Sequence, residues 1–317
     1  MRKKILMGHN FAREGFSELS DEFEMIYPDD RLFRRDDVLN LIRDADVLVP
    51  NFSFRTDKEI IDAGKKLKLI SNFGVGYDNI DVAYAAQQGI VVTNTPQSVL
   101  EPTAELCFAI MMATARRIGY YNTKLHNDER VDWDLFGDLG VPLYGQTLGI
   151  YGMGRIGQAV ARRAVASGMK IIYCNRKPLA EKIERQYNAR YVDFDTLLAE
   201  ADILSLHAPS TAETFHLMGE QEFKKMKPSA IFINTARGAL VDEQALIAAL
   251  ENKEIFAAGL DVYEHEPKIP DALRRLENVV LSPHAGTKTY AGRIEMEREV
   301  AKNIINFFNG GQVDRVN

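Results

Sequence analysis

The chain has 317 residues, of which 46% are apolar and 26% are charged, and its formal net charge is −6. This length exceeds what a single hydrophobic core usually serves, so we expect two domains. The acidic balance disfavours a nucleic-acid-binding protein, which needs a basic excess, and no apolar run approaches the roughly 18 residues of a transmembrane helix.

The cysteines and the N-terminal residues predict a reducing, cytoplasmic location. Cys107 and Cys174 lie far apart in the sequence, which is not the spacing of a disulfide framework or a zinc site. We expect both to be small buried apolar residues. The basic start is followed only by the short apolar run Ile5–Met7, which is too short for the apolar core of a signal peptide.

The first hundred residues alternate between short apolar runs and helical patterns. The apolar runs predict strands at Ile5–Met7, Phe23–Tyr27, Val47–Val49, Leu67–Ser71 and Ile90–Thr93. Apolar positions at helix spacing lie between them, at Val38, Leu39, Leu41 and Ile42 and again at Ile60 and Ile61. Because strands that alternate with helices pair in parallel, this region predicts a parallel sheet covered on both faces.

A long helical stretch follows, from about Pro102 to His126. Pro102 suits the first turn of a helix, and acidic residues beside it favour the positive end of the helix dipole. We expect this helix to cross from one domain to the other. The next stretch, residues 127–145, is polar and irregular and contains the single tryptophan, Trp133.

A second alternating series then begins. It predicts strands at Leu148–Tyr151, Lys170–Cys174, Arg190–Val192, Ile203–Leu206, Ala230–Asn234, Ala257–Leu260 and Val279–Leu281. A final helix is predicted from Ala291 to Phe308, before Gly310 and Gly311.

The first strand of this second series meets a glycine motif, G-x-G-x-x-G, formed by Gly152, Gly154 and Gly157. The motif lies between a strand and an Ala-rich helix, the context that a dinucleotide-binding turn requires. Gly152 permits the tight turn, Gly154 lets a pyrophosphate approach the backbone, and Gly157 lets the helix pack closely on the sheet. The first helical amides, at Arg155 and Ile156, would then face the phosphates.

These patterns predict an α/β protein with two Rossmann-like or flavodoxin-like parallel-sheet domains separated by a cleft. The dinucleotide-binding domain, residues 99–285, is inserted into a substrate domain made of residues 1–98 and 286–317. The connections near Thr95-Pro96 and near Pro283–Gly286 are the expected hinges.

Three polar clusters follow strands of the second series, where open α/β sheets bind ligands. They are Asn234-Thr235-Ala236-Arg237-Gly238, the run from Asp261 to Pro267, and Ser282-Pro283-His284-Ala285-Gly286.

With these motifs the chain resembles the D-isomer-specific 2-hydroxyacid dehydrogenases over essentially its whole length. The resemblance rests on the glycine motif, the run Phe73-Gly74-Val75-Gly76-Tyr77-Asp78-Asn79-Ile80-Asp81, the Asn-Thr-Ala-Arg-Gly run, the run from Gly259 to Pro267, and Pro283-His284. It implies that Arg237, Glu266 and His284 are the catalytic residues and that two nucleotide domains pair into a homodimer. The apolar cluster Phe108–Met112 is either such a dimer face or part of a buried helix.

The chemistry of 2-keto acid reduction gives these three residues separate roles. Histidine is the side chain best suited to give a proton to the developing alkoxide near neutral pH. Glu266 would favour the protonated imidazole of His284, and Arg237 offers a fork of donors to the substrate carboxylate and carbonyl. Glu264 and His265 are rivals for the role of Glu266, and only the resemblance chooses between them.

The same strand ends supply candidate cofactor contacts. Beyond the glycine loop we expect them at Thr103, His207, Pro209, Thr235, Ala236 and Asp261. Asp261 would bond either the nicotinamide amide or the linking loop, although a plain strand-end aspartate is an open alternative. His207 is either a cofactor contact or a packing residue.

The second strand of the nucleotide domain ends in Asn175, Arg176 and Lys177. An NAD-binding domain usually has a carboxylate here to hold the ribose hydroxyls. Asparagine followed by two cations favours the 2′-phosphate of NADP, because arginine binds phosphate with two parallel hydrogen bonds. We therefore favour NADP(H) over NAD(H); if the two cations are only a solvated loop, both cofactors would serve.

The resemblance implies a small 2-keto acid substrate such as glyoxylate or hydroxypyruvate. The backbone amides of Val75 and Gly76 would bind its carboxylate, and Phe52 and Phe54 would narrow the side-chain pocket or stack on a larger aromatic substrate. Either phenylalanine has ordinary packing as an equal alternative. The sequence Pro283-His284-Ala285-Gly286 departs mildly from the commoner Pro-His-Ile-Gly, so the reaction is better indicated than the substrate.

Two other functions remain open at this point. One is a phosphoglycerate dehydrogenase-like enzyme, and the other is a nucleotide-sensing corepressor or binding protein on the same fold. Reduction of a 2-keto acid, lost on His284→Ala, separates an enzyme from a sensor.

Overall fold

The computed structural model describes residues 2–131 and 133–317. The chain divides into two compact units, Met1–Pro102 with Thr287–Asn317 and Thr103–Gly286, which we call the first and second units. Each unit is built on one parallel sheet, and a strand occupies each of the twelve predicted places. The predicted α/β class with two parallel sheets is therefore confirmed.

The first unit has a five-stranded sheet in the order β2-β1-β3-β4-β5. Its strands are β1 Lys3–Met7, β2 Phe23–Ile26, β3 Val47–Val49, β4 Leu69–Ser71 and β5 Val91–Thr93. Its helices are α1 Arg35–Leu41, α2 Lys58–Ala63, α3 Val82–Gln87 and α12 Tyr290–Asn309, with the short 3-10 helices η1 Glu14–Leu19 and η2 Ile42–Asp44.

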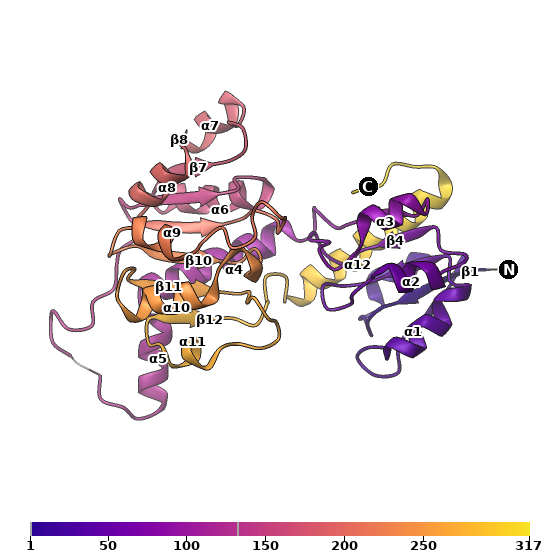
Figure 1. Ribbon diagram of the computed structural model, residues 1–317, viewed down its shortest axis with the longest axis horizontal. Helices are drawn as coiled ribbons and strands as arrows, with labels where there is room; N and C mark the ends of the chain where they lie inside the picture. The colour runs from indigo at the N-terminus through magenta and orange to yellow at the C-terminus, as the bar shows by residue number, and fades with distance from the viewer. Residues whose placement is uncertain (1, 132) are drawn as a thin grey trace. The chain divides into compact units, whose positions relative to one another are not determined.

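Both faces of this sheet are buried, as the sequence predicts for a parallel sheet. Ile5 and Met7 of β1 pack with η1 and α12, whereas Leu6, between them, packs with α1 and α2 on the other face. Figure 1 shows α12, in yellow, lying among the indigo elements from the start of the chain. The C-terminal helix thus completes the core of the N-terminal unit. It ends where predicted, at Gly310 with φ 72.

The second unit has a seven-stranded sheet in the order β12-β11-β10-β9-β6-β7-β8. Its strands are β6 Thr147–Tyr151, β7 Lys170–Cys174, β8 Ala189–Tyr191, β9 Ile203–Leu206, β10 Ile231–Asn234, β11 Ala257–Leu260 and β12 Val279–Leu281. Its helices are α4 Leu100–Ala115, which begins in the first unit, α5 Ile118–His126, α6 Arg155–Ala166, α7 Glu181–Tyr187, α8 Phe194–Glu200, α9 Glu220–Lys225, η3 Gly238–Leu240, α10 Glu243–Glu251 and α11 Asp271–Arg275.

The helices of the second unit also cover both faces of the sheet. Residues of α8, α9, α10 and α11 form one core with the strands, including Leu197, Phe223 and Leu246. On the other face α4 packs against β11, where only glycine fits at position 259 because a Cβ there would overlap Ile110 and Thr114.

The prediction of a single helix from Pro102 to His126 is wrong about its continuity. The stretch is two helices, α4 and α5, separated at Arg117, whose φ of 53 is left-handed. The carbonyl of Ala115 accepts the N–H of Val141 at 2.7 Å instead of a bond from the next helical turn. The polar segment after α5 therefore ends α4, through a contact that local helix propensity does not reveal.

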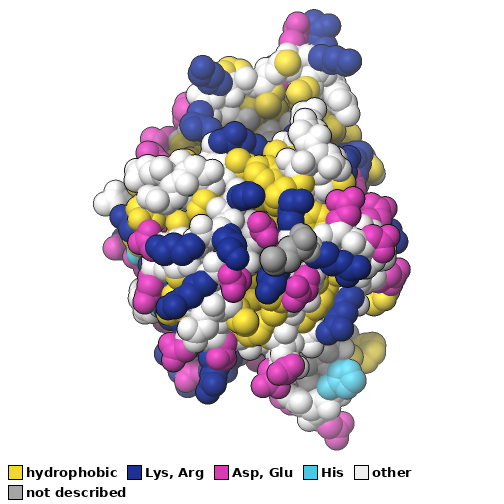
Figure 2. All heavy atoms as spheres, turned by 90° about the vertical axis from the view of Figure 1, so that its right-hand side faces the viewer, with side chains coloured by type: hydrophobic (Ala, Val, Ile, Leu, Met, Phe, Trp, Pro, Cys, Tyr) yellow, Lys and Arg dark blue, Asp and Glu magenta, His cyan; other side chains and the backbone are white. Residues whose placement is uncertain are grey.

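Charge distribution and helix length bear on nucleic-acid and membrane binding. On the face in Figure 2, basic and acidic side chains are interspersed, whereas nucleic-acid-binding proteins cluster basic residues. Within residues 2–131 and 133–317, every helix is too short or too polar to span a bilayer. The cytoplasmic location stays a prediction.

Candidate active site

The second sheet has a topological switch point beside its central strand. From β6 the chain adds β7 and β8 on one side, then returns to add β9, β10, β11 and β12 on the other. Register pairs Tyr151 at the end of β6 with Cys174 on one side and Leu206 on the other, so the carboxyl ends of these strands are aligned. Open α/β sheets bind ligands at such a point.

The glycine loop follows β6 at this switch point. Gly152 has φ 89, and a Cβ there would lie 2.8 Å from the Ala208 nitrogen, so the turn needs glycine. A Cβ on Gly154 would meet nothing within 4 Å, which leaves open space above the backbone. A Cβ on Gly157 would lie 2.8 Å from the Gly152 oxygen.

Helix α6 begins at Arg155 and Ile156, and no side chain caps its N-terminus. Its first amide groups therefore remain available to an anionic ligand. Together with the open space above Gly154, this arrangement fits the pyrophosphate of a dinucleotide.

The end of β7 carries the residues expected to read the cofactor ribose. Asn175 Oδ1 accepts the N–H of Met153 at 2.7 Å, so this side chain also fixes the glycine loop. The hydroxyl of Tyr191 donates to the Asn175 carbonyl at 3.2 Å. Arg176 and Lys177 are exposed beyond it.

The end of β9 contributes His207 and Pro209. His207 Nε2 lies 2.9 Å from the Ser205 hydroxyl, and the Cys107 Sγ of α4 lies 3.5 Å from the same hydroxyl. Burial lowers the pKa of His207 to about 4, so this imidazole is neutral at physiological pH. Pro209 is exposed, and its carbonyl accepts the Thr214 hydroxyl at 2.8 Å.

The structure brings His284 and Glu266 together. The Nδ1 of His284 lies 2.7 Å from Glu266 Oε2. Because an ionised carboxylate can only accept, Nδ1 carries the shared proton, and Nε2 is the ring nitrogen that does not face Glu266. The N–H of Tyr263 donates to the other carboxylate oxygen at 3.1 Å.

Of the two rivals for the role of Glu266, Glu264 contacts a different histidine, His216, at 2.7 Å, and His265 is exposed. Among these three residues, Glu266 is therefore the one seen in contact with His284.

Arg237 follows β10, the strand next to β11. Asn234 shapes this turn, because its Nδ2 donates to the Arg237 carbonyl at 2.9 Å and its Oδ1 accepts the Ala236 N–H at 3.0 Å. Thr235 is buried within the turn. The guanidinium is held partly by its own backbone, since Nη1 donates to the Ala236 carbonyl at 2.6 Å.

Asp261 joins the ends of β11 and β12. Its carboxylate accepts the N–H groups of Ala285 at 2.7 Å and Gly286 at 2.9 Å, and its carbonyl accepts the N–H of His284 at 2.8 Å. Burial raises the pKa of this carboxyl, although the Ala285 N–H opposes that rise. Of the alternatives raised by the sequence, the contacts seen are those to the linking loop. Thr103 lies beside the same loop, facing Gly286.

In the first unit, two asparagine side chains hold backbone carbonyls of the loop after β4. Asn94 Nδ2 donates to the Val75 carbonyl at 2.8 Å, and Asn72 Nδ2 donates to the carbonyls of Gly74 at 3.0 Å and Gly76 at 2.7 Å. Because N–H and C=O point oppositely across a trans peptide, the amides of Val75 and Gly76 point away from these asparagines. The sequence predicts these amides as carboxylate contacts, but it did not predict Asn72 and Asn94, which bond the neighbouring carbonyls.

The two candidate pocket phenylalanines of the first unit differ in environment. Phe52 is 41% exposed, whereas Phe54 is 7% exposed and lies in the core with Ile60 and Ile80. Phe52 is therefore the one that a ligand can reach.

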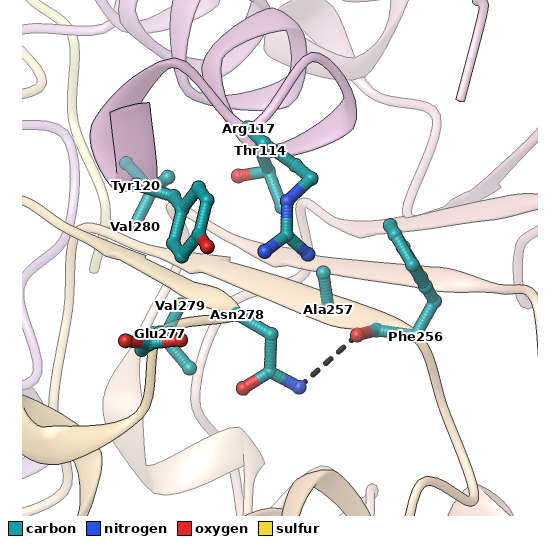
Figure 3. A pocket seen from close by; sticks show the side chains of 9 residues that line it. All are labelled: Thr114, Arg117, Tyr120, Phe256, Ala257, Glu277, Asn278, Val279 and Val280. Atoms are coloured by element: carbon teal, nitrogen blue, oxygen red, sulfur yellow. Dashed lines mark hydrogen bonds between the residues drawn. The ribbon is translucent and has the colours of Figure 1, made fainter. Parts of the chain in front are cut away.

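A separate small hollow lies at the amino-terminal ends of two strands of the second sheet. It is lined by Arg117, Tyr120 and the residues that begin β11 and β12, including Ala257 and Val279 (Figure 3). Since ligands of open α/β sheets bind at the carboxyl ends of strands, this amino-terminal position does not suit the candidate active site.

Comparison with known proteins matches the chain to one family. Residues 108–286 match the model of the D-isomer specific 2-hydroxyacid dehydrogenase NAD binding domain. A glyoxylate reductase of Thermococcus litoralis is 45% identical over 98% of this chain and 95% of its own length. A glyoxylate reductase of Pyrococcus horikoshii is 41% identical over 98% of this chain and 94% of its own.

Solved structures give the same result. A glyoxylate reductase from Paecilomyes thermophila has a TM-score of 0.90 and 36% identity, covering 99% of this chain and 98% of its own. An NADPH-dependent glyoxylate/hydroxypyruvate reductase from Sinorhizobium meliloti, in complex with NADP and malonate, has a TM-score of 0.88 and 32% identity, covering 100% of this chain and 97% of its own.

Proposed function

Because the chain belongs to the D-isomer-specific 2-hydroxyacid dehydrogenases, we propose that it reduces glyoxylate or hydroxypyruvate with His284 as the general acid. The chain is an NAD(P)-dependent oxidoreductase acting on 2-hydroxy acids. The observation that carries the finer proposal is the contact of 2.7 Å between His284 Nδ1 and Glu266 Oε2.

In the proposed reaction, a bound reduced nicotinamide would supply the hydride for the carbonyl carbon. His284, protonated and oriented by Glu266, donates a proton from Nε2 to the carbonyl oxygen as it gains charge. Arg237 binds the substrate carboxylate and polarises the carbonyl through its guanidinium. Glu266 does not exchange the proton; it stabilises the imidazolium and fixes the ring by accepting from Nδ1.

The substrate is proposed to be small and anionic. The Val75 and Gly76 N–H groups belong to the peptides whose carbonyls accept from Asn72 and Asn94, and we expect these N–H groups to donate to the substrate carboxylate. Phe52 is proposed to limit the size of the substrate side chain. The similarity to a glyoxylate reductase and to a glyoxylate/hydroxypyruvate reductase supports these two acids as the proposed substrates.

A cofactor-consumption screen tests this function. We expect the purified protein to oxidise NADPH in the presence of glyoxylate or hydroxypyruvate, and to do so faster than with pyruvate, 2-ketogluconate or aromatic pyruvates. An absence of turnover with every 2-keto acid, using either NADPH or NADH, would contradict the proposal and favour a nucleotide-sensing role.

We also propose NADP(H) as the preferred cofactor, on the exposed pair Arg176 and Lys177. A guanidinium–phosphate contact contributes about 1.5–3 kcal/mol, so Arg176→Gln is expected to lower kcat/KM with NADPH by about 10- to 100-fold. The value with NADH, which lacks the 2′-phosphate, is expected to stay nearly unchanged.

Arg185→Gln is the matched control, because Arg185 is an exposed cation on α7 that pairs with Glu181. It is expected to leave kcat/KM unchanged with both NADPH and NADH. If the wild-type kcat/KM with NADH equals or exceeds that with NADPH, the proposed preference is wrong.

A homodimer is proposed through the second unit. Within the helix face expected at Phe108–Met112, Ile110 and Met111 are buried in the single chain. Large exposed apolar side chains instead lie along α5 and the segment after it: Ile118, Leu125, Trp133, Leu135, Phe136, Leu139 and Tyr144. A monomeric protein rarely exposes such a patch. Light scattering is expected to give the mass of two chains for the wild type. For the double variant Leu135→Glu with Phe136→Glu, it is expected to give the mass of one chain. A monomeric wild type would refute the dimer.

A further inference from the structure

A buried carboxylate, Glu243, lies behind the loop that carries Glu266. It is the first residue of α10, its exposed fraction is 6%, and its Oε1 accepts the N–H of Glu264 at 2.8 Å. Burial raises the pKa of Glu243, although the hydrogen bond from the Glu264 N–H opposes that rise. A carboxylate is costly to bury unless it is well paired, yet here its hydrogen-bond partner is a backbone amide of the active-site loop.

The peptide unit that Glu243 holds is a junction between two catalytic segments. Gly238, directly after Arg237, packs so closely on the Tyr263–Glu264 peptide that a Cβ would overlap it. The N–H of Tyr263, one peptide earlier, donates to Glu266 Oε1 at 3.1 Å. The position of this short backbone stretch therefore sets both the Arg237 turn and the Glu266 carboxylate.

Side chains anchor the same loop at two further points. The Glu264 carboxylate lies 2.7 Å from His216 Nε2. The Tyr263 hydroxyl donates to the Ser282 carbonyl at 2.9 Å, two residues before His284. The backbone N–H of Glu264 is another anchor point, and Glu243 supplies its acceptor.

We propose that Glu243 is a positioning residue for the reduction. By accepting the Glu264 N–H it fixes the loop of Glu266 against the Arg237–Gly238 turn, and thereby sets the orientation of the His284 ring. This inference rests on the proposed function, in which His284 gives the proton. The role needs an oxygen acceptor at the right distance and does not need a charge.

Three substitutions of Glu243 distinguish the effects of its hydrogen-bond acceptor, its negative charge and its side-chain length. Glu243→Gln keeps an oxygen acceptor without the charge, Glu243→Ala removes both, and Glu243→Asp keeps the charge but withdraws the oxygen. Because misplacing a catalytic group by about 1 Å costs up to 10²-fold in rate, we expect kcat to fall about 10- to 100-fold in the alanine and aspartate variants. In Glu243→Gln we expect kcat within about threefold of wild type, as the acceptor remains.

A fall in kcat with an unchanged Kd for NADPH distinguishes a positioning role from general damage to the fold. The Kd for NADPH is expected to stay unchanged in all three variants, because the glycine loop follows β6, whereas the loop that Glu243 holds follows β11, with β9 and β10 lying between these two strands. Asp242→Ala is the matched control: it removes the cap of α10, which Asp242 makes to Gln244 and Ala245, without touching the Glu264 N–H. It is expected to lower the Tm and leave kcat near wild type.

The outcomes separate this inference from the proposed function. No turnover by the wild type would contradict the function itself. An active wild type together with an unchanged kcat in Glu243→Asp and Glu243→Ala would overturn the positioning role, as would a Glu243→Gln variant as slow as Glu243→Asp. If Glu243→Ala does not fold, the glutamine and aspartate pair decides. A control Asp242→Ala that slows the reaction equally would assign the loss to helix stability and overturn the inference.

Discussion

Replacing His284 with alanine is expected to lower kcat for 2-keto acid reduction by about 10²–10⁴-fold, the usual contribution of a positioned general acid. The His284 imidazole contacts Glu266 at 2.7 Å, so the variant removes both the proton donor and the partner of that carboxylate. The Kd for NADPH, measured by fluorescence titration, is expected to stay within about twofold, since a loss confined to the chemical step leaves ground-state binding intact.

A neighbouring histidine provides the control for this experiment. His265 is exposed, lies next to Glu266 in the sequence and was a rival for the role of Glu266. His265→Ala is expected to keep nearly full activity. If His284→Ala retains the wild-type kcat, or if His265→Ala loses as much as His284→Ala, the assigned general acid is wrong.

Gly238→Ala is expected to destabilise the protein by about 3 kcal/mol, the upper end of what overpacking usually costs, and to abolish most activity. A Cβ at this position would overlap the carbonyl carbon and oxygen of Tyr263. Both are backbone atoms, so no flexible side chain can move aside. The Arg237 turn and the Glu266 loop would have to separate, which damages folding and catalysis together.

Gly119→Ala is the matched glycine substitution. Gly119 lies in α5, and a Cβ there would meet only Val280 Cγ2 at 3.5 Å, an ordinary contact. Because alanine favours the helix over glycine by about 1 kcal/mol, this variant is expected to be at least as stable as wild type. Urea unfolding measures both changes. A Gly238→Ala protein as stable as wild type would show that the two loops are not tightly packed.

The strands could be predicted from sequence because each is a short apolar run between helical patterns. Lys170–Cys174 and Ile203–Leu206 occur with the predicted bounds, since a parallel strand buried on both faces needs nearly continuous apolar residues. The break between α4 and α5 could not be predicted. It depends on Val141 donating to Ala115, a contact between residues far apart in sequence, whereas the local pattern favours one continuous helix.

The candidate site was predictable where its chemistry lies in side chains that follow strands. His284 and Glu266 stand after neighbouring strands, and the structure places them in contact. Asn72, Asn94 and Glu243 were missed because each binds backbone atoms of a loop, and any loop residue offers the same atoms. The sequence does not show which polar residues are buried or which backbone atoms they bond. Only the folded structure shows both.

The most direct test of the central claim follows the hydride itself. Purified protein is supplied with hydroxypyruvate and NADPH carrying deuterium at the transferable position of the nicotinamide, and the product is analysed by mass spectrometry and chiral chromatography. The account predicts D-glycerate with deuterium on C2. An unlabelled product, an L-configured product or no product at all would contradict it.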